Sequence, residues 1–252
     1  MIHAVLLLLA ACGSDPRLEG KVVDVWGEPV EGATVMMVGQ PERPLTDHEG
    51  RYSLPLVPGK HVLKAGRDGY IQDHAEIEIT EGEPGEGPLF RLYRKPEAAG
   101  YYLVGSGGYT ALKPQTVRNV GNELSQFRGL ESTGDVRGES GAFRAILHTE
   151  LKLDQILRLG LELHELEFVR KAQLHGPVAT VEVEVNLYSS KREIPISIQP
   201  MQSPTDYLIT TEGALPPGTY AFQTQDLLEP GDPEAFAQIP TDLRAVHPFE
   251  LR

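Results

Sequence analysis

Residues that form turns recur along this chain at short intervals, and this feature most strongly limits the folds that it can adopt. The 252 residues include 26 glycines and 20 prolines, a load that favours many short strands over long helices. Between the turns, apolar and polar residues alternate as they do in half-buried strands, most clearly over Val178–Leu187. The sequence therefore predicts an all-β protein.

The local turn chemistry is clearest in residues 18–94. Asp24 and Gly27 lie three residues apart, as do Asp47 and Gly50. Aspartate at the first position and glycine at the fourth are typical of a type I turn, in which the carboxylate accepts a backbone N–H. Strand-like runs with alternating apolar residues surround these turns. We therefore expect a small antiparallel β-sandwich over residues 18–94, followed by a second β-rich domain over residues 95–252.

Three motifs in this first region carry a resemblance to a known family. They read Gly20-x-Val22-x-Asp24-x-x-Gly27-x-Pro29-Val30-x-Gly32-Ala33-x-Val35, then Thr46-Asp47-x-x-Gly50-x-Tyr52-x-Leu54, and then Pro58-Gly59-x-His61-x-Leu63-x-Ala65 with Gly69-Tyr70. This succession resembles the carboxypeptidase regulatory-like family. The resemblance implies a seven-stranded, prealbumin-like sandwich, with signature residues that serve turns and core and a module that is not itself catalytic.

Cys12 is the only cysteine, and it follows the apolar run from Val5 to Ala11. The tetrad Leu9-Ala10-Ala11-Cys12 resembles the lipobox of bacterial lipoproteins, which implies a signal peptide over residues 1–11 and a diacylglycerol on the Cys12 thiol. The apolar run is too short to span a bilayer, which takes about 20 residues. Residues 12–17 would then be the lipidated cysteine and a short tether. An ordinary secretory signal is the alternative, because no Lys or Arg precedes Val5.

This anchor predicts a location in the bacterial cell envelope, with the protein held on a membrane by lipid. Gly13 rather than Asp follows the cysteine, which by resemblance to enterobacterial sorting implies the outer membrane. The net charge of −13 excludes nucleic acid as a partner, since phosphates require clusters of Lys and Arg. A single lipidated cysteine also leaves no thiol for disulfides or metal sites.

The second region resembles no family, and parts of its pattern are ambiguous. Strands are expected at Tyr101–Val104, Asp206–Thr211 and the C-terminus, and Ile194–Ile198 is typical of an edge strand because its proline cannot donate to a ladder. Residues 143–172 fit either a helix or a strand, and the polar row opposite the alternating leucines favours a strand. Asn119–Gly141 is rich in Gly and Ser and is predicted to be a long loop.

No catalytic pattern emerges strongly from the sequence. Two His-x-x-Glu strings, beginning at His164 and His247, fit the spacing of zinc peptidase ligands. Chance explains both, because the chain holds 8 histidines and 36 acidic residues, and His164 is expected on a polar strand face. We therefore expect no enzyme activity, no cofactor and no bound metal.

Four aromatic residues are candidates for a sugar-stacking platform, because aromatic faces suit that role. They are Trp26, Tyr70, Tyr101 and Tyr102. The leading hypothesis is a membrane-anchored envelope protein that binds or scaffolds other envelope proteins or glycans. The alternatives are a carbohydrate-binding accessory protein of a polysaccharide-uptake system and an enzyme with its site in residues 95–252.

Overall fold

A computed structural model describes residues 16–82, 85–122, 125–224, 227–228 and 245–252. The expected signal peptide and Cys12 lie outside these described residues. The chain divides into two compact units, Met1–Arg94 and Lys95–Arg252. Within the described ranges, no helix combines the length and the apolar character that crossing a membrane requires.

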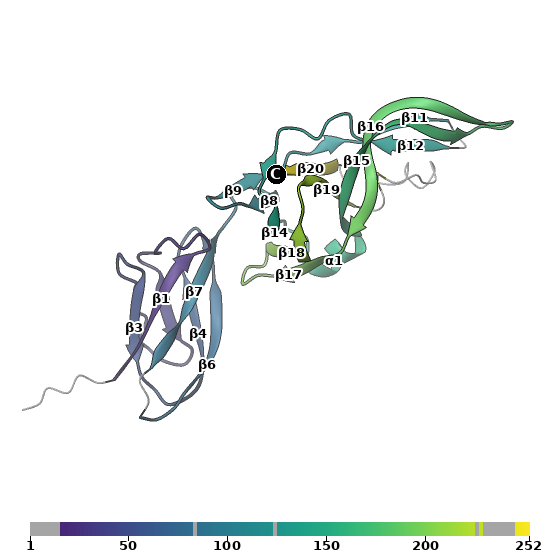
Figure 1. Cartoon of the computed structure of the whole chain (residues 1–252). Coiled ribbons are helices and arrows are strands. Elements are labelled where there is room, and N and C mark those ends of the chain that lie inside the picture. The colour runs from purple at the N-terminus through teal and green to yellow at the C-terminus, as the bar shows by residue number, and fades with distance from the viewer. Residues whose placement is uncertain (1–15, 83–84, 123–124, 225–226, 229–244) are drawn as a thin grey trace, which may run out of the picture. The chain divides into compact units, whose positions relative to one another are not determined.

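The described part of the first unit contains seven strands in two sheets (Figure 1). Their order is β3-β1-β7-β5 in one sheet and β2-β4-β6 in the other. The strands are β1 (Arg17–Asp24), β2 (Thr34–Met37), β3 (Arg51–Pro55), β4 (Gly59–Gly66), β5 (Tyr70–Ile71), β6 (Asp73–Ile79) and β7 (Glu86–Arg94). The predicted seven-stranded sandwich is confirmed.

Two details of the first unit differ from the prediction. Strands β1 and β7 pair in parallel, whereas the sandwich was expected to be antiparallel throughout. The first and last strands of the unit lie side by side, and the chain between them supplies the long connection that a parallel pair requires. Arg17, assigned to the tether, belongs to β1, where it pairs with Pro55 and donates from Nη2 to the Ser53 carbonyl over 2.9 Å.

The core of the sandwich explains two signature glycines. Tyr52 packs on Phe90 at 6.0 Å between ring centroids and donates its hydroxyl to the Pro88 carbonyl over 2.9 Å. A Cβ at Gly20 would lie 2.3 Å from the Tyr52 hydroxyl, so a side chain at this position would displace the ring. Gly50 has a φ of +75° and lies against the Val22 carbonyl, where any Cβ would clash.

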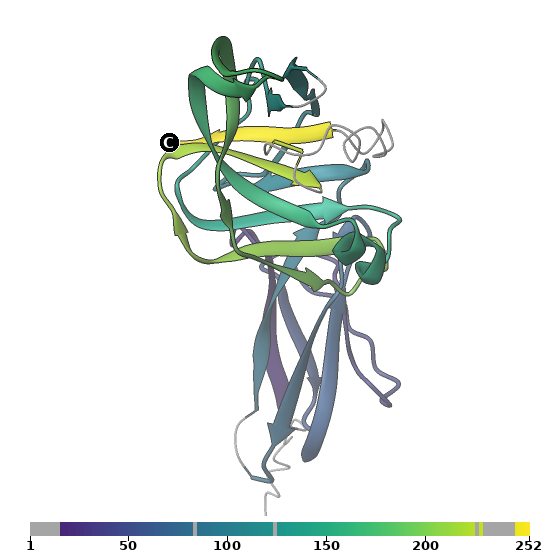
Figure 2. The ribbon, with the colours of Figure 1, turned by 90° about the vertical axis from the view of Figure 1, so that its right-hand side faces the viewer.

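The second unit is also a β-structure, and Figure 2 shows its two larger sheets lying one above the other. Their orders are β10-β20-β19-β15-β16 and β17-β18-β14-β8-β9, with β13 joined to β20 and a separate β11-β12 pair. Side chains from both large sheets share one core, including Phe143 and Ile209 from one sheet and Phe222 and Phe249 from the other.

The elements of the second unit have the following bounds. They are β8 (Gly100–Val104), β9 (Tyr109–Ala111), β10 (Gln115–Thr116), β11 (Arg118–Gly121), β12 (Gln126–Gly129), β13 (Arg137–Gly138), β14 (Gly141–His148), α1 (Leu153–Arg158), β15 (Leu161–His175), β16 (Thr180–Ile194), β17 (Ile196–Pro200), β18 (Asp206–Leu215), β19 (Gly218–Thr224) and β20 (Ala245–Leu251). The strands expected in this unit are present, but the one expected over Ile194–Ile198 is divided at Pro195. Ile194 ends β16, and Ile196 begins β17, which lies at the edge of its sheet as predicted.

Two predictions in this unit are wrong. The strand favoured for residues 143–172 is interrupted by helix α1, whose residue Leu157 is 61% exposed and whose end is followed by Gly160 at a φ of +61°. Glycine in the left-handed region commonly ends a helix. Here the change from helix to strand falls within a run of alternating leucines, so the alternation alone did not indicate the helix. The long loop predicted for residues 119–141 contains most of β11 and all of β12 and β13.

Candidate binding site

One end of the first unit is organised by the carboxylate of Asp24, which is 1% exposed. Its Oδ1 accepts the backbone N–H groups of Trp26 and Glu28, both over 3.0 Å, and its Oδ2 accepts Nη2 of Arg94 over 3.0 Å. The Gly27 N–H closes the turn on the Asp24 carbonyl at 3.0 Å. This is the turn that the Asp24–Gly27 spacing predicts, and it fixes both Trp26 and Arg94.

Arg94 stacks on Trp26 at the end of β7. Its Cζ lies 5.0 Å from the centroid of the indole, within the range of a cation–π contact. Arg94 also pairs in register with Tyr70 of β5 and hydrogen-bonds to the Tyr70 side chain. Burial opposes the charge, but the hydrogen bonds with Asp24 and Tyr70 raise the pKa of Arg94 above its ordinary value. The guanidinium is therefore a fixed positive charge between two aromatic rings.

Tyr70 has a second cationic neighbour. The Cζ of Arg67 lies 6.0 Å from the centroid of the Tyr70 ring, and the Tyr70 N–H donates to the Arg67 carbonyl over 3.0 Å. Trp26, Arg94, Tyr70 and Arg67 thus form a succession of alternating aromatic and cationic side chains, which we call the rim row. It brings together two of the four predicted aromatic candidates.

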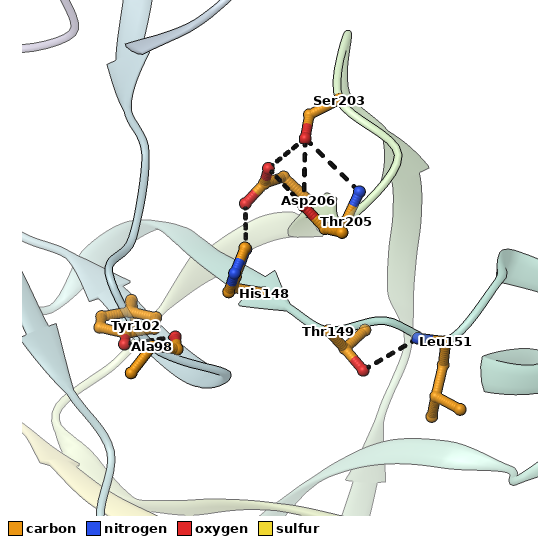
Figure 3. Close-up of polar contacts among 8 residues, drawn as sticks. All are labelled: Ala98, Tyr102, His148, Thr149, Leu151, Ser203, Thr205 and Asp206. Carbon is orange, nitrogen blue, oxygen red and sulfur yellow. Dashed lines mark hydrogen bonds and ion pairs between the residues drawn. The ribbon is translucent and has the colours of Figure 1, made fainter. Parts of the chain in front are cut away.

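The other two candidates, Tyr101 and Tyr102, belong to β8 in the second unit. Adjacent residues of a strand point to opposite faces, and these two follow that rule. Tyr101 stacks on Phe222 at 4.9 Å and contacts His247 at 4.6 Å, and its burial raises the pKa of its hydroxyl. Tyr102 lies on the other face and donates its hydroxyl to the Ala98 carbonyl over 2.7 Å (Figure 3).

A polar cluster lies on the sheet formed by β14 and β18 (Figure 3). The carboxyl group of Asp206 is fully buried and bonds to His148 Nδ1 over 2.8 Å. Ser203 Oγ and Thr205 Oγ1 also donate to it. The Met201 N–H returns to the Asp206 carbonyl over 3.0 Å, so the cluster closes the turn that precedes β18.

His164 differs in one respect from its prediction. It lies on a polar strand face as expected, but that face is buried: the side chain is 1% exposed, and His164 pairs in register with Ala221, a member of a buried apolar cluster. Its Nδ1 lies 2.6 Å from Ser190 Oγ and its Nε2 lies 2.9 Å from Glu162 Oε2, to which Gln223 also donates over 3.0 Å. Among the described residues, no group of three or more His, Cys, Asp or Glu side chains could hold a metal ion.

Arg94 and Arg67 were not identified from the sequence. Arg94 lies 70 residues from Asp24, and no local pattern indicates that contact. The one available signal for Arg67 was its spacing of three from Tyr70 across a turn that contains Gly69. The four aromatic residues were identified because aromatic faces suit sugar stacking, and Trp26 also because it falls in a turn.

Comparison with known proteins identifies the class of the first unit. Residues 17–89 match the family model described as a carboxypeptidase regulatory-like domain, so this unit carries that domain, in agreement with its three motifs and its seven strands. No curated protein matches the chain. One similar solved structure is described as a "putative carbohydrate binding protein" from Bacteroides uniformis ATCC 8492. It is 10% identical, with coverage of 84% of this chain and 89% of that one, at a TM-score of 0.24.

Proposed function

We propose that this chain is a lipid-anchored protein of the bacterial envelope that binds glycans without catalysis, with the rim row as its ligand site. The observation that carries the proposal is the alternation of two aromatic rings with two guanidinium groups at one end of the first unit. Aromatic faces stack on the apolar faces of sugar rings, and guanidinium groups donate to their hydroxyls.

The signature residues of the domain support a binding role because they are committed to structure. Asp47 Oδ1 accepts the N–H groups of Glu49 and Arg51 over 2.9 and 2.8 Å. Thr46 Oγ1 accepts the Ala33 N–H over 2.8 Å. These groups hold turns and strands, and the rim row is the part of this end that combines rings and charge at the surface.

The proposal is testable because Trp26 is the only tryptophan of the chain. Its fluorescence therefore reports on the rim row without background from the second unit. We expect one or more members of a panel of neutral and acidic oligosaccharides to shift the emission. Isothermal titration of the Trp26→Ala and Tyr70→Ala variants should show affinity reduced by about tenfold or more, equivalent to about 1.4 kcal/mol each.

Tyr109→Ala is the matched control, because Tyr109 is a partly exposed tyrosine of the second unit. It should leave affinity unchanged. If no oligosaccharide of the panel binds, or if Trp26→Ala binds as well as the unaltered chain, the glycan proposal is wrong. If the protein is instead a scaffold, it should bind no glycan and should co-purify with specific envelope proteins from native membranes.

The anchor is tested separately. Cells grown with radiolabelled palmitate should label the unaltered chain and not the Cys12→Ser variant, which should also leave the membrane fraction. Two acyl chains suffice for stable anchoring, since each buried methylene contributes about 0.8 kcal/mol. Ser14→Ala is the control and should be labelled normally. An unlabelled chain, or a Cys12→Ser variant that stays on the membrane, would contradict the anchor.

An enzyme in the second unit is the second candidate, and one contact set favours it. Ser190, His164 and Glu162 are joined in the order nucleophile, base and orienting carboxylate. Labelling by a fluorophosphonate probe that is lost in Ser190→Ala would support an enzyme. If the Ser190→Ala variant is labelled as strongly as the unaltered chain, or if neither is labelled, the three residues form a structural hydrogen-bond network and not a catalytic site.

A further inference from the structure

A shallow depression of about 800 Å³ lies beside the rim row and shares Arg67 and Tyr70 with it. Three cationic side chains line it, Arg43, Lys64 and Arg67, and Asp68 is the one acidic residue of the lining. Thr34 and Gln72 add polar side chains to the lining, and these can donate or accept hydrogen bonds. A cationic surface is unexpected in a chain whose net charge is −13.

The charges of these three cations are not balanced by ion pairs in the part of the chain that the structure describes. Within the residues that the structure describes, none of Arg43, Lys64 and Arg67 takes part in an ion pair, and all three are exposed. The same part of the chain pairs many of its other cations with carboxylates, as in the 3.0 Å contact between Arg94 and Asp24.

Two other depressions on the first unit show the contrast. In one, Lys60 lies 3.9 Å from Glu78, and Glu76 adds a second acid to the lining. In the other, Lys21 and Arg51 are balanced by Glu19 and Asp47, and Arg51 is further paired with Glu49. The depression beside Tyr70 is therefore distinguished by an excess of positive charge.

The fold holds these cations on three neighbouring segments. Lys64 lies on β4, directly opposite Met36 of β2 and His74 of β6. Arg67 follows β4 in the turn that leads to Tyr70, and its guanidinium lies over the Tyr70 ring. Arg43 precedes Pro44, whose carbonyl accepts the Val35 N–H over 3.0 Å and so ties that segment to β2.

From these observations we infer that the ligand is an acidic glycan, whose carboxylate or sulfate groups are bound by Arg43, Lys64 and Arg67 while a sugar ring stacks on Tyr70. Guanidinium groups bind such oxyanions through paired N–H donors, and Arg43 and Lys64 have no ion pair among the described residues to give up on binding. A ring with an attached anion fits this combination of aromatic face and charge better than a phosphate alone. The inference rests on the proposed glycan-binding function and names the ligand class of that site.

The experiment compares glycans that differ only in charge. Tetragalacturonate is titrated against its fully methyl-esterified form, and a chondroitin sulfate hexasaccharide against its desulfated form, on the full chain in detergent at about 0.05 M salt. We expect at least one acidic member to bind about tenfold or more tightly than its partner, with the difference reduced at about 0.5 M salt because screening weakens exposed charge pairs.

Variants locate the effect. Arg43→Gln combined with Lys64→Gln should reduce binding of the acidic glycan to that of its neutral partner. Both side chains are exposed, and within the described residues neither takes part in an ion pair. Lys60→Gln is the matched control, because it removes one exposed lysine from a different depression. It should leave the preference unchanged. Thermal unfolding of all variants checks that they fold.

The outcomes separate the two proposals. If neutral and acidic members bind equally well and Trp26→Ala abolishes both, the rim row binds glycans and the inference of an acidic ligand is wrong. If no glycan binds, both proposals fail. If inorganic phosphate, or vesicles containing phosphatidylglycerol, compete as strongly as the acidic glycan and bind without it, the depression recognises simple anions or headgroups, and the inference is overturned.

Discussion

The two units differ in how far along the chain the partners of their polar side chains lie. In the first unit, the carboxylates of Asp24 and Asp47 bind backbone N–H groups only two and four residues further along the chain, and the contact of Asp24 with Arg94 is the long-range exception. In the second unit, His148 binds Asp206 across 58 residues, and Gln223 binds Glu162 across 61. Local contacts leave a motif in the sequence, whereas contacts between distant strands do not.

This difference also predicts where the protein is sensitive to substitution. A turn carboxylate can be replaced in part by water, because its partners lie near the surface. A buried network between strands has no such substitute, because each lost partner leaves a donor or acceptor without one. Three substitutions test this comparison, in order of decreasing expected effect.

The largest effect is expected for Asp206→Ala. This change leaves the donors of His148, Ser203 and Thr205 without their acceptor. We expect the free energy of unfolding to fall by about 4 kcal/mol, because each buried donor without a partner costs about 1–3 kcal/mol. Urea unfolding followed by circular dichroism measures it.

The control for this substitution is Asp154→Ala, in the exposed pair with Arg158 on α1. Such pairs contribute about 0–1 kcal/mol, so this variant should unfold almost as the unaltered chain does. Equal effects of the two substitutions would show that the Asp206 cluster does not stabilise the second unit.

The next effect concerns pH and His247, which is half-buried and packs on Tyr101 of β8. Burial lowers the pKa of His247 to about 4. In the unfolded chain the pKa of this histidine is about 6.5, so between about pH 6.5 and about pH 4 the unfolded chain binds a proton that the folded chain does not bind. The free energy of unfolding therefore falls as the pH drops through this range. The total loss should reach about 3 kcal/mol and then level off.

His247→Phe removes this proton uptake. Urea unfolding at pH 7 and pH 4.5 should show a much smaller difference for the variant than for the unaltered chain. His74→Phe, at an exposed position of β6, is the matched control and should preserve the full difference. The explanation would fail if His247→Phe kept the same dependence on pH.

The smallest effect is expected for Thr46→Val in the first unit. Thr46 is buried, accepts the Ala33 N–H over 2.8 Å and donates to the Val30 carbonyl over 2.5 Å. Valine keeps the shape and removes both hydrogen bonds, which should cost about 2 kcal/mol. Thr80→Val, at an exposed position of the same unit, should change stability by less than about 0.5 kcal/mol. Equal unfolding midpoints for the two variants would contradict a role for this signature residue in stability.

The sequence predicted those parts of the fold whose causes are local. The spacing of Asp24 and Gly27 indicated the observed turn, and the alternation before Leu187 indicated β16. It failed where a local pattern had two physical readings, as at Leu157, where helix α1 ends just before a strand. The strands between residues 119 and 141 were missed because they are short and lack apolar alternation: β11 and β12 pair with each other, and β13 pairs with the distant β20.

In the candidate site, too, the sequence indicated some residues and not those brought together by long-range pairing. Trp26 and Tyr70 were predicted because the residue type alone, an aromatic ring, suggests sugar stacking. Arg94 was missed because no local motif indicates the pairing of β5 with β7, which places Arg94 beside Tyr70. Arg43, in the connection between β2 and β3, and Lys64, on β4, were missed because exposed charged residues usually bind only water.

Hydrogen exchange of the full chain, with and without the tightest-binding glycan, shows which unit holds the ligand. If the ligand site lies on the first unit, amide exchange should slow at residues 24–28 and 67–72, which contain the rim row's turns, while β14, β18 and the rest of the second unit stay unchanged. Slower exchange confined to the second unit on binding would contradict the account.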